Sequence, residues 1–349
     1  MKLPKYSMGV GDRFGHQGIA QLEAIQQAND DGIEVCPVWN KSHREHELTG
    51  TSPDEVRREA DMATEALGWD GPYFVDADHV GLDTVDLFLG SSDYFTIDVA
   101  DLTGEPAPPA QADAFADSYL ELAGKIDVPG LAEPLDISTA DIRDIASKYL
   151  LAVQEAGRIY RKIESALGGD SFVAELSMDE TDTPQTPKEL LFILAAVADQ
   201  GIPIQAIAPR FSGRFNKGVD YVGDVDEFRR EFEADVCVLH FARDTFGLPG
   251  NLKLSIHSGS DKFSIYGPMR EVITEHDAGL HLKTAGTTWL EELIGLACAG
   301  GDGLEVARRI YAEAYDRLDE LCEPYAEVTD IHKDRLPNPD DVADWSGEK

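Results

Sequence analysis

The sequence has few cysteines and no long apolar run. Its four cysteines, Cys36, Cys237, Cys298 and Cys322, lie far apart and form no CxxC pair, which argues against a zinc ribbon or a disulfide framework. The N-terminal stretch MKLPKYSMGVGD lacks the apolar core of a secretory signal, and no segment approaches the roughly 18 apolar residues of a membrane span. These absences predict a cytoplasmic protein that does not cross a membrane.

Positive charge is also scarce. The 349 residues include 66 Asp and Glu against 30 Lys and Arg, which gives a formal net charge of -36. Such a surface repels phosphate backbones and anionic lipids, so the composition argues against nucleic acid and membrane surfaces as partners. Very high salt screens self-repulsion to within a few Å, and the composition therefore favours a halophilic source with a salt-rich cytosol.

The charge balance predicts how stability depends on salt. Raising KCl toward molar concentrations should raise the melting temperature, because salt screens the repulsion among acidic side chains. Thermal unfolding followed by circular dichroism over a KCl series measures this directly. A melting temperature that falls along the series would contradict the halophilic assignment.

Eight short β-rich runs are spaced along the chain. They cover residues 6–10, 33–38, 73–78, 94–99, 172–178, 203–209, 252–257 and 279–283. Helical patterns lie between them, for example at 18–31, 53–67, 138–167, 187–200, 225–240 and 286–297. Alternating strands and helices predict a parallel sheet, and eight such units with right-handed crossovers close an α/β fold of the (β/α)8 TIM-barrel type.

One connection between predicted strands is much longer than the others. Between the fourth and fifth strands, residues 104–136 are acidic and rich in proline, and we expect an insertion there with a helix near 111–125. Residues 302–324 have the pattern of a C-terminal helix, and residues 336–349 that of a frayed acidic tail. We therefore expect one barrel domain over residues 1–335.

Polar residues follow almost every predicted strand, on the side where TIM barrels carry their active sites. Only nine histidines occur, and three of them, His79, His257 and His281, lie at the ends of the third, seventh and eighth strands. A single histidine at such a position is more often a satisfied core residue. Three that converge with carboxylates match the composition of divalent-metal sites, so we expect a metal.

Carboxylates at the same strand ends are candidates for proton transfer. Chemistry at a sugar C–H or O–H bond needs an acid and a base on different sides of the substrate. Asp78 and Glu175 come from two strands and fit these roles, with Glu180 a competitor for the second. Asp76 shares a face with Asp78 by strand alternation, so we expect the charge of one to raise the pKa of the other.

Three basic residues, Arg210, Lys262 and Lys283, follow the last three strands. Directed into the mouth of so acidic a barrel, they indicate an anionic group on the ligand, although pairing with active-site carboxylates explains any one of them equally well. The segment GVGDRFG at residues 9–15 is neither a P-loop nor a complete GxGxxG motif, which favours a carboxylate over a phosphate or a dinucleotide. We interpret the segment SHREHE, residues 42–47, as a solvated loop.

Eight segments carry a resemblance to a known family. They are SMGVGDRFGHQG (7–18), PVWNKSHREH (37–46), YFVDADHV (73–80), YFTIDVAD (94–101), AELSMDETDTPQTP (174–187), IQAIAPRFSGRFNKGVDYVGD (204–224), SIHSGSDKFSIY (255–266) and HLKTAGTTWLE (281–291). At these motifs the chain resembles the tagaturonate epimerase family, which interconverts tagaturonate and fructuronate and depends on a divalent metal. The resemblance implies that His79, His257 and His281 ligate the metal. It also implies that Asp78 and a second acid, either Glu175 or Glu180, exchange protons with the substrate. The metal is then Zn, Mn, Ni or Co.

The implied substrates suggest a mechanism. The two ketouronates differ at a carbon one position removed from the carbon next to the ketone, so proton abstraction beside the carbonyl would not invert the right centre. A retro-aldol route would: the carbon–carbon bond opens to an enediolate and an aldehyde, the aldehyde turns, and the bond closes again. Arg210 and the two lysines would hold the carboxylate meanwhile.

Two other functional classes remain open at this point. One is a metal-dependent aldose–ketose isomerase or class II aldolase that uses the same side chains. The other is a non-catalytic barrel that binds sugar acids. The sequence leaves the oligomeric state open, including a homo-oligomer.

Overall fold

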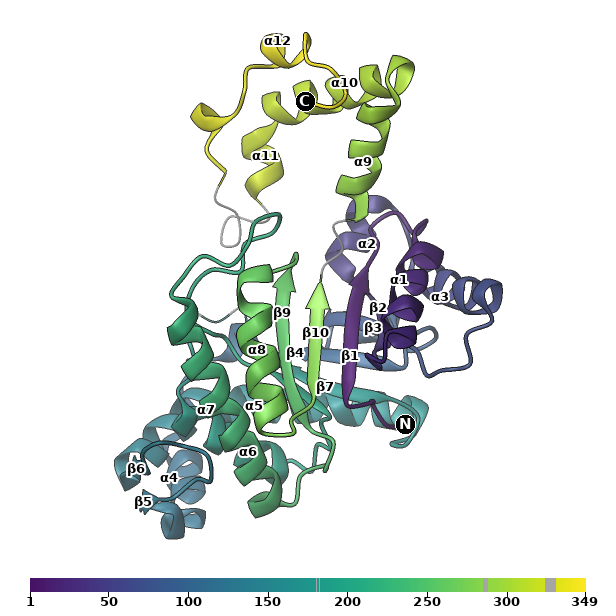
Figure 1. Cartoon of the computed structure of the whole chain (residues 1–349). Coiled ribbons are helices and arrows are strands. Elements are labelled where there is room, and N and C mark those ends of the chain that lie inside the picture. Colours follow the sequence, from purple (N-terminus) through teal and green to yellow (C-terminus); the bar gives the residue numbers. More distant parts are fainter. Residues whose placement is uncertain (180, 182, 285–287, 324–330) are drawn as a thin grey trace.

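The protein is built around a closed, wholly parallel barrel of eight strands (Figure 1). The computed structural model describes all 349 residues except 180, 182, 285–287 and 324–330. Neighbouring strands follow one another in chain order, and the last strand pairs with the first. The strands are β1 (Tyr6–Gly11), β2 (Cys36–Ser42), β3 (Phe74–Val80), β4 (Tyr94–Asp98), β7 (Val173–Ser177), β8 (Ala206–Ala208), β9 (Lys253–Gly259) and β10 (Leu280–Thr284). The predicted (β/α)8 TIM-type fold is confirmed.

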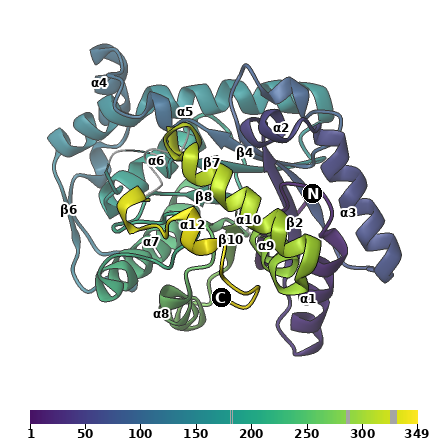
Figure 2. The same cartoon turned by 90° about the horizontal axis from the view of Figure 1, so that it is seen from above.

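Helices cover the outside of the barrel (Figure 2). They are α1 (Gly18–Asp30), α3 (Pro53–Leu67), α5 (Thr139–Leu167), α6 (Pro187–Asp199), α7 (Val225–Phe246) and α8 (Phe263–Glu275). Their starts follow local chemistry: Ser138 with Asp141 and Thr186 with Glu189 form capping boxes, and Pro187 occupies the first turn of α6. Among the described helices, none is long and apolar enough to cross a membrane.

Two predictions for the N-terminal part of the chain are wrong. The segment interpreted as a solvated loop forms a short helix, α2 (His43–Thr49), in which Glu45 and His46 are buried. The Ser42 side chain caps its start, and Gly50 ends it in the left-handed conformation. The second strand begins at Cys36 rather than at residue 33, because Ile33 is exposed, and it continues through the buried polar residues Asn40, Lys41 and Ser42.

The barrel interior is apolar only at its amino-terminal end. A cluster of buried side chains fills that end, namely Leu3, Cys36, Val38, Phe74, Tyr94 and Val173. Above it, buried polar and charged side chains occupy the interior, among them Asp76, Glu175, His281 and Lys283. Buried charges require partners, so this arrangement already concentrates ion pairs beneath the carboxyl ends of the strands.

The connection after β4 contains a small subdomain that packs on the outer helices. It consists of α4 (Pro109–Ser118) followed by an antiparallel hairpin of β5 (Gly124–Ile126) and β6 (Leu135–Ile137). The helix expected near 111–125 therefore ends earlier and a hairpin follows. Helix α4 packs on α5, and Gly130 in the hairpin loop lies against Cys237 of α7 and His276 after α8.

The C-terminal helices lie beyond the carboxyl ends of the strands (Figures 1 and 2). Helix α9 (Thr288–Ala299) extends away from the barrel and packs on α10 (Gly301–Asp316), so it does not return alongside the strands. The single helix expected at 302–324 is divided into α10 and α11 (Leu318–Cys322). The segment expected to be a frayed tail includes α12 (Pro339–Val342), which packs on α10.

The hairpin contact at Gly130 predicts the outcome of a glycine substitution. A Cβ at Gly130 would lie 2.5 Å from the Cys237 sulfur, and its φ is +95°. Gly104 has a matching φ of +93° but no atom within 4 Å of an added Cβ. Gly130→Ala should therefore lower the free energy of unfolding by about 1–3 kcal/mol more than Gly104→Ala, because only the first substitution overpacks a contact. Urea unfolding of both variants measures the difference, and equal losses would contradict the predicted contact.

Candidate active site

A bulge in β3 directs two consecutive side chains to the mouth of the barrel. Strand alternation would place Asp78 and His79 on opposite faces. The register of β3 against β4 shifts between Ala77 and Val80, and His79 adopts a φ of 53°. A positive φ is uncommon outside glycine, and such strain concentrates at functional sites. Here it directs His79 into the same pocket as Asp78.

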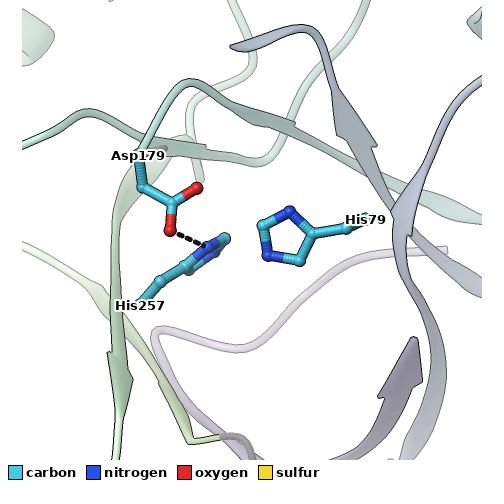
Figure 3. Close-up of side chains that lie close together, drawn as sticks. All are labelled: His79, Asp179 and His257. Atoms are coloured by element: carbon cyan, nitrogen blue, oxygen red, sulfur yellow. Dashed lines mark ion pairs between the residues drawn. The ribbon is translucent and has the colours of Figure 1, made fainter. Parts of the chain in front are cut away.

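Two histidines and one carboxylate converge at the mouth (Figure 3). His79, Asp179 and His257 each offer one ligand-type atom, and these atoms lie within 4.8 Å of one another. The His257 Nδ1 atom is 3.1 Å from Asp179 Oδ2. Two imidazoles and a carboxylate are a donor set that suits Zn, Mn, Fe, Co or Ni, so these three residues could hold a divalent cation.

Each of these histidines has a carboxylate behind it. His79 Nδ1 lies 3.1 Å from Asp98 Oδ2, and His257 Nε2 lies 2.5 Å from Glu175 Oε1. Metal-binding histidines usually engage a carboxylate through their second ring nitrogen, which fixes the ring and makes it a better ligand. Within the described part of the chain, the buried His257 Nδ1 has no hydrogen-bond partner of good geometry. The donors and their support fit a cation at this point.

The carboxylates control the charge of both rings. Burial lowers the pKa of each histidine, but the neighbouring carboxylates outweigh it. Asp78 and Asp98 help raise the pKa of His79 to about 10, while Asp179 and Glu175 raise the pKa of His257 to about 9. The site therefore demands positive charge, supplied either by protons on the imidazoles or by a cation held between them.

A buried lysine lies at the centre of the barrel. The Lys283 Nζ atom is 2.7 Å from Asp76 Oδ2 and 2.6 Å from Asp78 Oδ1, and it also donates to Thr96 Oγ1. Burial raises the pKa of Asp76 to about 6 despite the lysine. For Asp78, burial acts in the same direction, but Lys283 and the nearby histidines lower its pKa to about 2. Asp78 therefore stays ionised to a lower pH than Asp76, and it lines the pocket.

Glu175 is less accessible than Asp78. Glu175 is fully buried, accepts a hydrogen bond from the Tyr94 hydroxyl and contacts His257, but does not line the pocket. Glu180 lies outside the described residues. Asp179 is not among the predicted site residues, but it lines the pocket beside His79 and His257.

His281 and one of the predicted cations, Lys262, do not line the pocket. His281 stands apart from the two other histidines: its Nδ1 atom is 2.9 Å from Ser7 Oγ and its ring packs on Tyr94. Lys262 is fully buried, donates to the oxygens of Ser260 and does not line the pocket. Arg210 does line it.

A second group of potential ligands lies on the outside of the barrel. Glu233, Glu275 and His276 approach one another on α7 and α8. The guanidinium of Arg229 lies 3.0 Å from Glu233 and 3.9 Å from Glu275. This group is accounted for as a surface ion-pair cluster.

The site opens into a pocket of about 910 Å³. Its lining includes the acids and histidines described above. It also includes Arg44, Arg210, Arg214 and Lys217 from the connections after β2 and β8, and we call these four residues the rim. Sequence reasoning found Arg210 but missed the other three. The motif NK at 216–217 stands in the middle of a long loop rather than at a strand end, so strand-end reasoning could not select it.

The fold places the protein in the (β/α)8-barrel class, whose enzymes carry their active sites at the carboxyl ends of the strands, where this pocket lies. A family model described as tagaturonate epimerase matches residues 1–346. The chain belongs to the tagaturonate epimerase family and is an epimerase, in the isomerase class. The tagaturonate/fructuronate epimerase of Thermotoga maritima is 30% identical over 352 residues, covering 97% of this chain and 68% of that protein.

Solved structures agree with this assignment. The fructuronate-tagaturonate epimerase of Cohnella laeviribosi in complex with two glycerols is 26% identical, with a TM-score of 0.80 over 100% of this chain and 69% of that one. Its complex with one glycerol is 28% identical, with a TM-score of 0.78 over 98% and 68% of the two chains. Both support the family assignment and the barrel fold.

The buried lysine predicts a large effect on stability. Lys283→Met would leave Asp76 and Asp78 buried without their cation, and the free energy of unfolding should fall by about 3–5 kcal/mol. Lys125→Met, on the exposed strand β5, removes the same charge at the surface and should change stability by less than about 0.5 kcal/mol. Denaturant unfolding compares the two variants. Adding Asp76→Asn to Lys283→Met should restore part of the loss, and a loss below about 1 kcal/mol in Lys283→Met would contradict the ion-pair account.

Proposed function

We propose that this chain is a divalent-metal-dependent epimerase that interconverts D-tagaturonate and D-fructuronate in the strand-end pocket. Family membership and the names of the relatives from Thermotoga maritima and Cohnella laeviribosi support the reaction. One structural observation carries the metal dependence: His79, Asp179 and His257 converge, and each histidine has a carboxylate at its other nitrogen.

The proposed metal ligands are His79, His257 and Asp179, with Asp179 in place of the expected His281. A divalent cation bound there, with Zn, Mn, Ni and Co as the candidates, would supply Lewis-acid polarisation of the substrate ketone and its neighbouring hydroxyl. Glu175 and Asp98 act as positioning residues, because they fix the orientation of the histidine rings.

Asp78 is the proposed base on one face of the substrate. Its carboxylate lines the pocket and stays ionised beside Lys283. It takes the proton from the hydroxyl on the inverting carbon, the electrons of that O–H bond form the aldehyde, and the broken carbon–carbon bond leaves its pair in an enediolate. After the aldehyde turns, the same steps run in reverse and return a proton to the new alkoxide.

The proton on the opposite face requires a second acid. Glu180 remains the proposed group, since it directly follows Asp179 in the chain. Glu175 does not suit this role, because it is fully buried behind His257. Arg210 on the rim is a proposed substrate contact, and Lys283 acts on Asp78 rather than on the substrate.

Nuclear magnetic resonance in D2O tests the reaction and its route together. Incubated with D-fructuronate, the protein should form D-tagaturonate without deuterium at the inverting carbon, because retro-aldol chemistry leaves that C–H bond intact. Asp78→Asn should slow the reaction by about 10²- to 10⁴-fold, the usual loss when a general base is removed. Deuterium at the inverting carbon would exclude the route, and no turnover of either ketouronate would exclude the function.

The same assay carries the metal controls. EDTA should abolish turnover, and Zn, Mn, Ni or Co should restore it. Full activity in EDTA, with no metal in the protein by mass spectrometry, would contradict the metal dependence. Accumulation of two fragments would indicate an aldolase instead.

A further inference from the structure

Basic side chains line the pocket, although the chain as a whole has 66 acidic and only 30 basic residues. Arg44 comes from the first turn of α2, and Lys217 comes from the segment between β8 and α7. Arg13, after β1, lies 3.2 Å from the buried carboxylate of Glu45 in the same region. Three separate connections therefore bring cations to one place.

Lys217 is held there by neighbouring residues. Gly259, at the end of β9, has a φ of +65°, and a Cβ added to it would lie 3.0 Å from Lys217 Cγ. The glycine thus leaves room for the lysine stem beside the strand that carries His257. The next backbone N–H, that of Gly218, donates to Ser260 Oγ at 2.9 Å.

Lys262 stabilises the segment around Lys217 through Ser260. Its Nζ atom donates to the carbonyl and the hydroxyl oxygen of Ser260, both at 2.8 Å, and that hydroxyl also accepts from Gly218. A fully buried lysine thereby fixes the connection in which Lys217 lies. The sequence predicts that Lys262 contacts the ligand. In the structure, Lys262 instead stabilises the loop that contains Lys217.

The charges around Lys217 suit an anionic ligand. Burial lowers the pKa of Lys217, the carboxylate of Glu45 acts against this, and the charges of Arg13 and Arg44 lower it further. Asp78 is also close enough to influence it. An anion that enters between like charges relieves their repulsion and gains charge-assisted hydrogen bonds. Lys217 and Arg44 therefore line the same pocket as the proposed base, Asp78.

The geometry points to Lys217, with Arg44 beside it, as the group that binds the substrate carboxylate and so selects sugar acids over neutral ketoses. This inference rests on the proposed function, because it names the determinant of substrate class within the same pocket. It also relocates the carboxylate contact, which moves from Lys262 and Lys283 to the rim.

Lys217→Met tests the subsite, because it keeps a stem of similar length against Gly259 and removes the charge. We expect kcat/KM for the ketouronates to fall by on the order of 10- to 100-fold, mainly through KM, as for the loss of a hydrogen bond to a charged group. Lys217→Arg should retain most of the activity. Lys125→Met, the matched change on exposed β5, should leave it unchanged.

Neutral ketoses provide the second readout. D-Tagatose and D-fructose lack the carboxylate, so their inhibition constants against ketouronate turnover should stay within about twofold of wild type in Lys217→Met. The subsite is overturned if the ketouronate KM does not change, or if neutral ketoses weaken as much as ketouronates do. If wild type turns over no ketouronate, the proposed function fails; if wild type is active and Lys217→Met retains its discrimination, only the subsite fails.

Discussion

The buried ion pairs of Lys283 are the constraint on which the rest of the site depends. A single amine on β10 reaches across the barrel to Asp76 and Asp78 on β3 and to Thr96 on β4. Two carboxylates in a desolvated interior are tolerable only with such a partner, since an unpaired buried charge costs several kcal/mol. The pairing fixes the position of Asp78 at the mouth and keeps it ionised. The bulge that follows then places His79 beside it.

Histidine orientation follows from a second layer of carboxylates. Asp98 contacts the ring of His79 and fixes its orientation, and Glu175 does the same for the ring of His257. The Tyr94 hydroxyl donates a hydrogen bond to Glu175 and fixes its position. Tyr94 belongs to the apolar cluster at the amino-terminal end of the barrel. Packing at the bottom of the barrel is therefore connected to ring orientation at the top through two hydrogen bonds.

The sequence predicts the barrel and its active face well, because strand count and polar strand ends are local patterns. It predicts individual roles less well. Alternation separates Asp78 from His79, and only the positive φ of His79 brings them together. The small number of histidines in the chain favours His281 as a metal ligand, yet its position on β10 directs the ring toward Ser7 and Tyr94. The helical pattern after β10 predicted α9 but could not say that it packs on α10, since periodicity does not identify a helix's partner.

The net charge of the chain and the charge of the pocket rim have opposite signs, and this difference bears on recognition. A formal charge of -36 repels an anionic substrate at long range. In concentrated salt that repulsion is screened beyond a few Å, whereas contacts inside a partly buried pocket are screened much less. Contacts with cations inside the pocket, such as Lys217 and Arg44, can then determine whether an anion binds, although the net charge of the surface repels it. An acidic surface and a basic rim are compatible because they act over different distances.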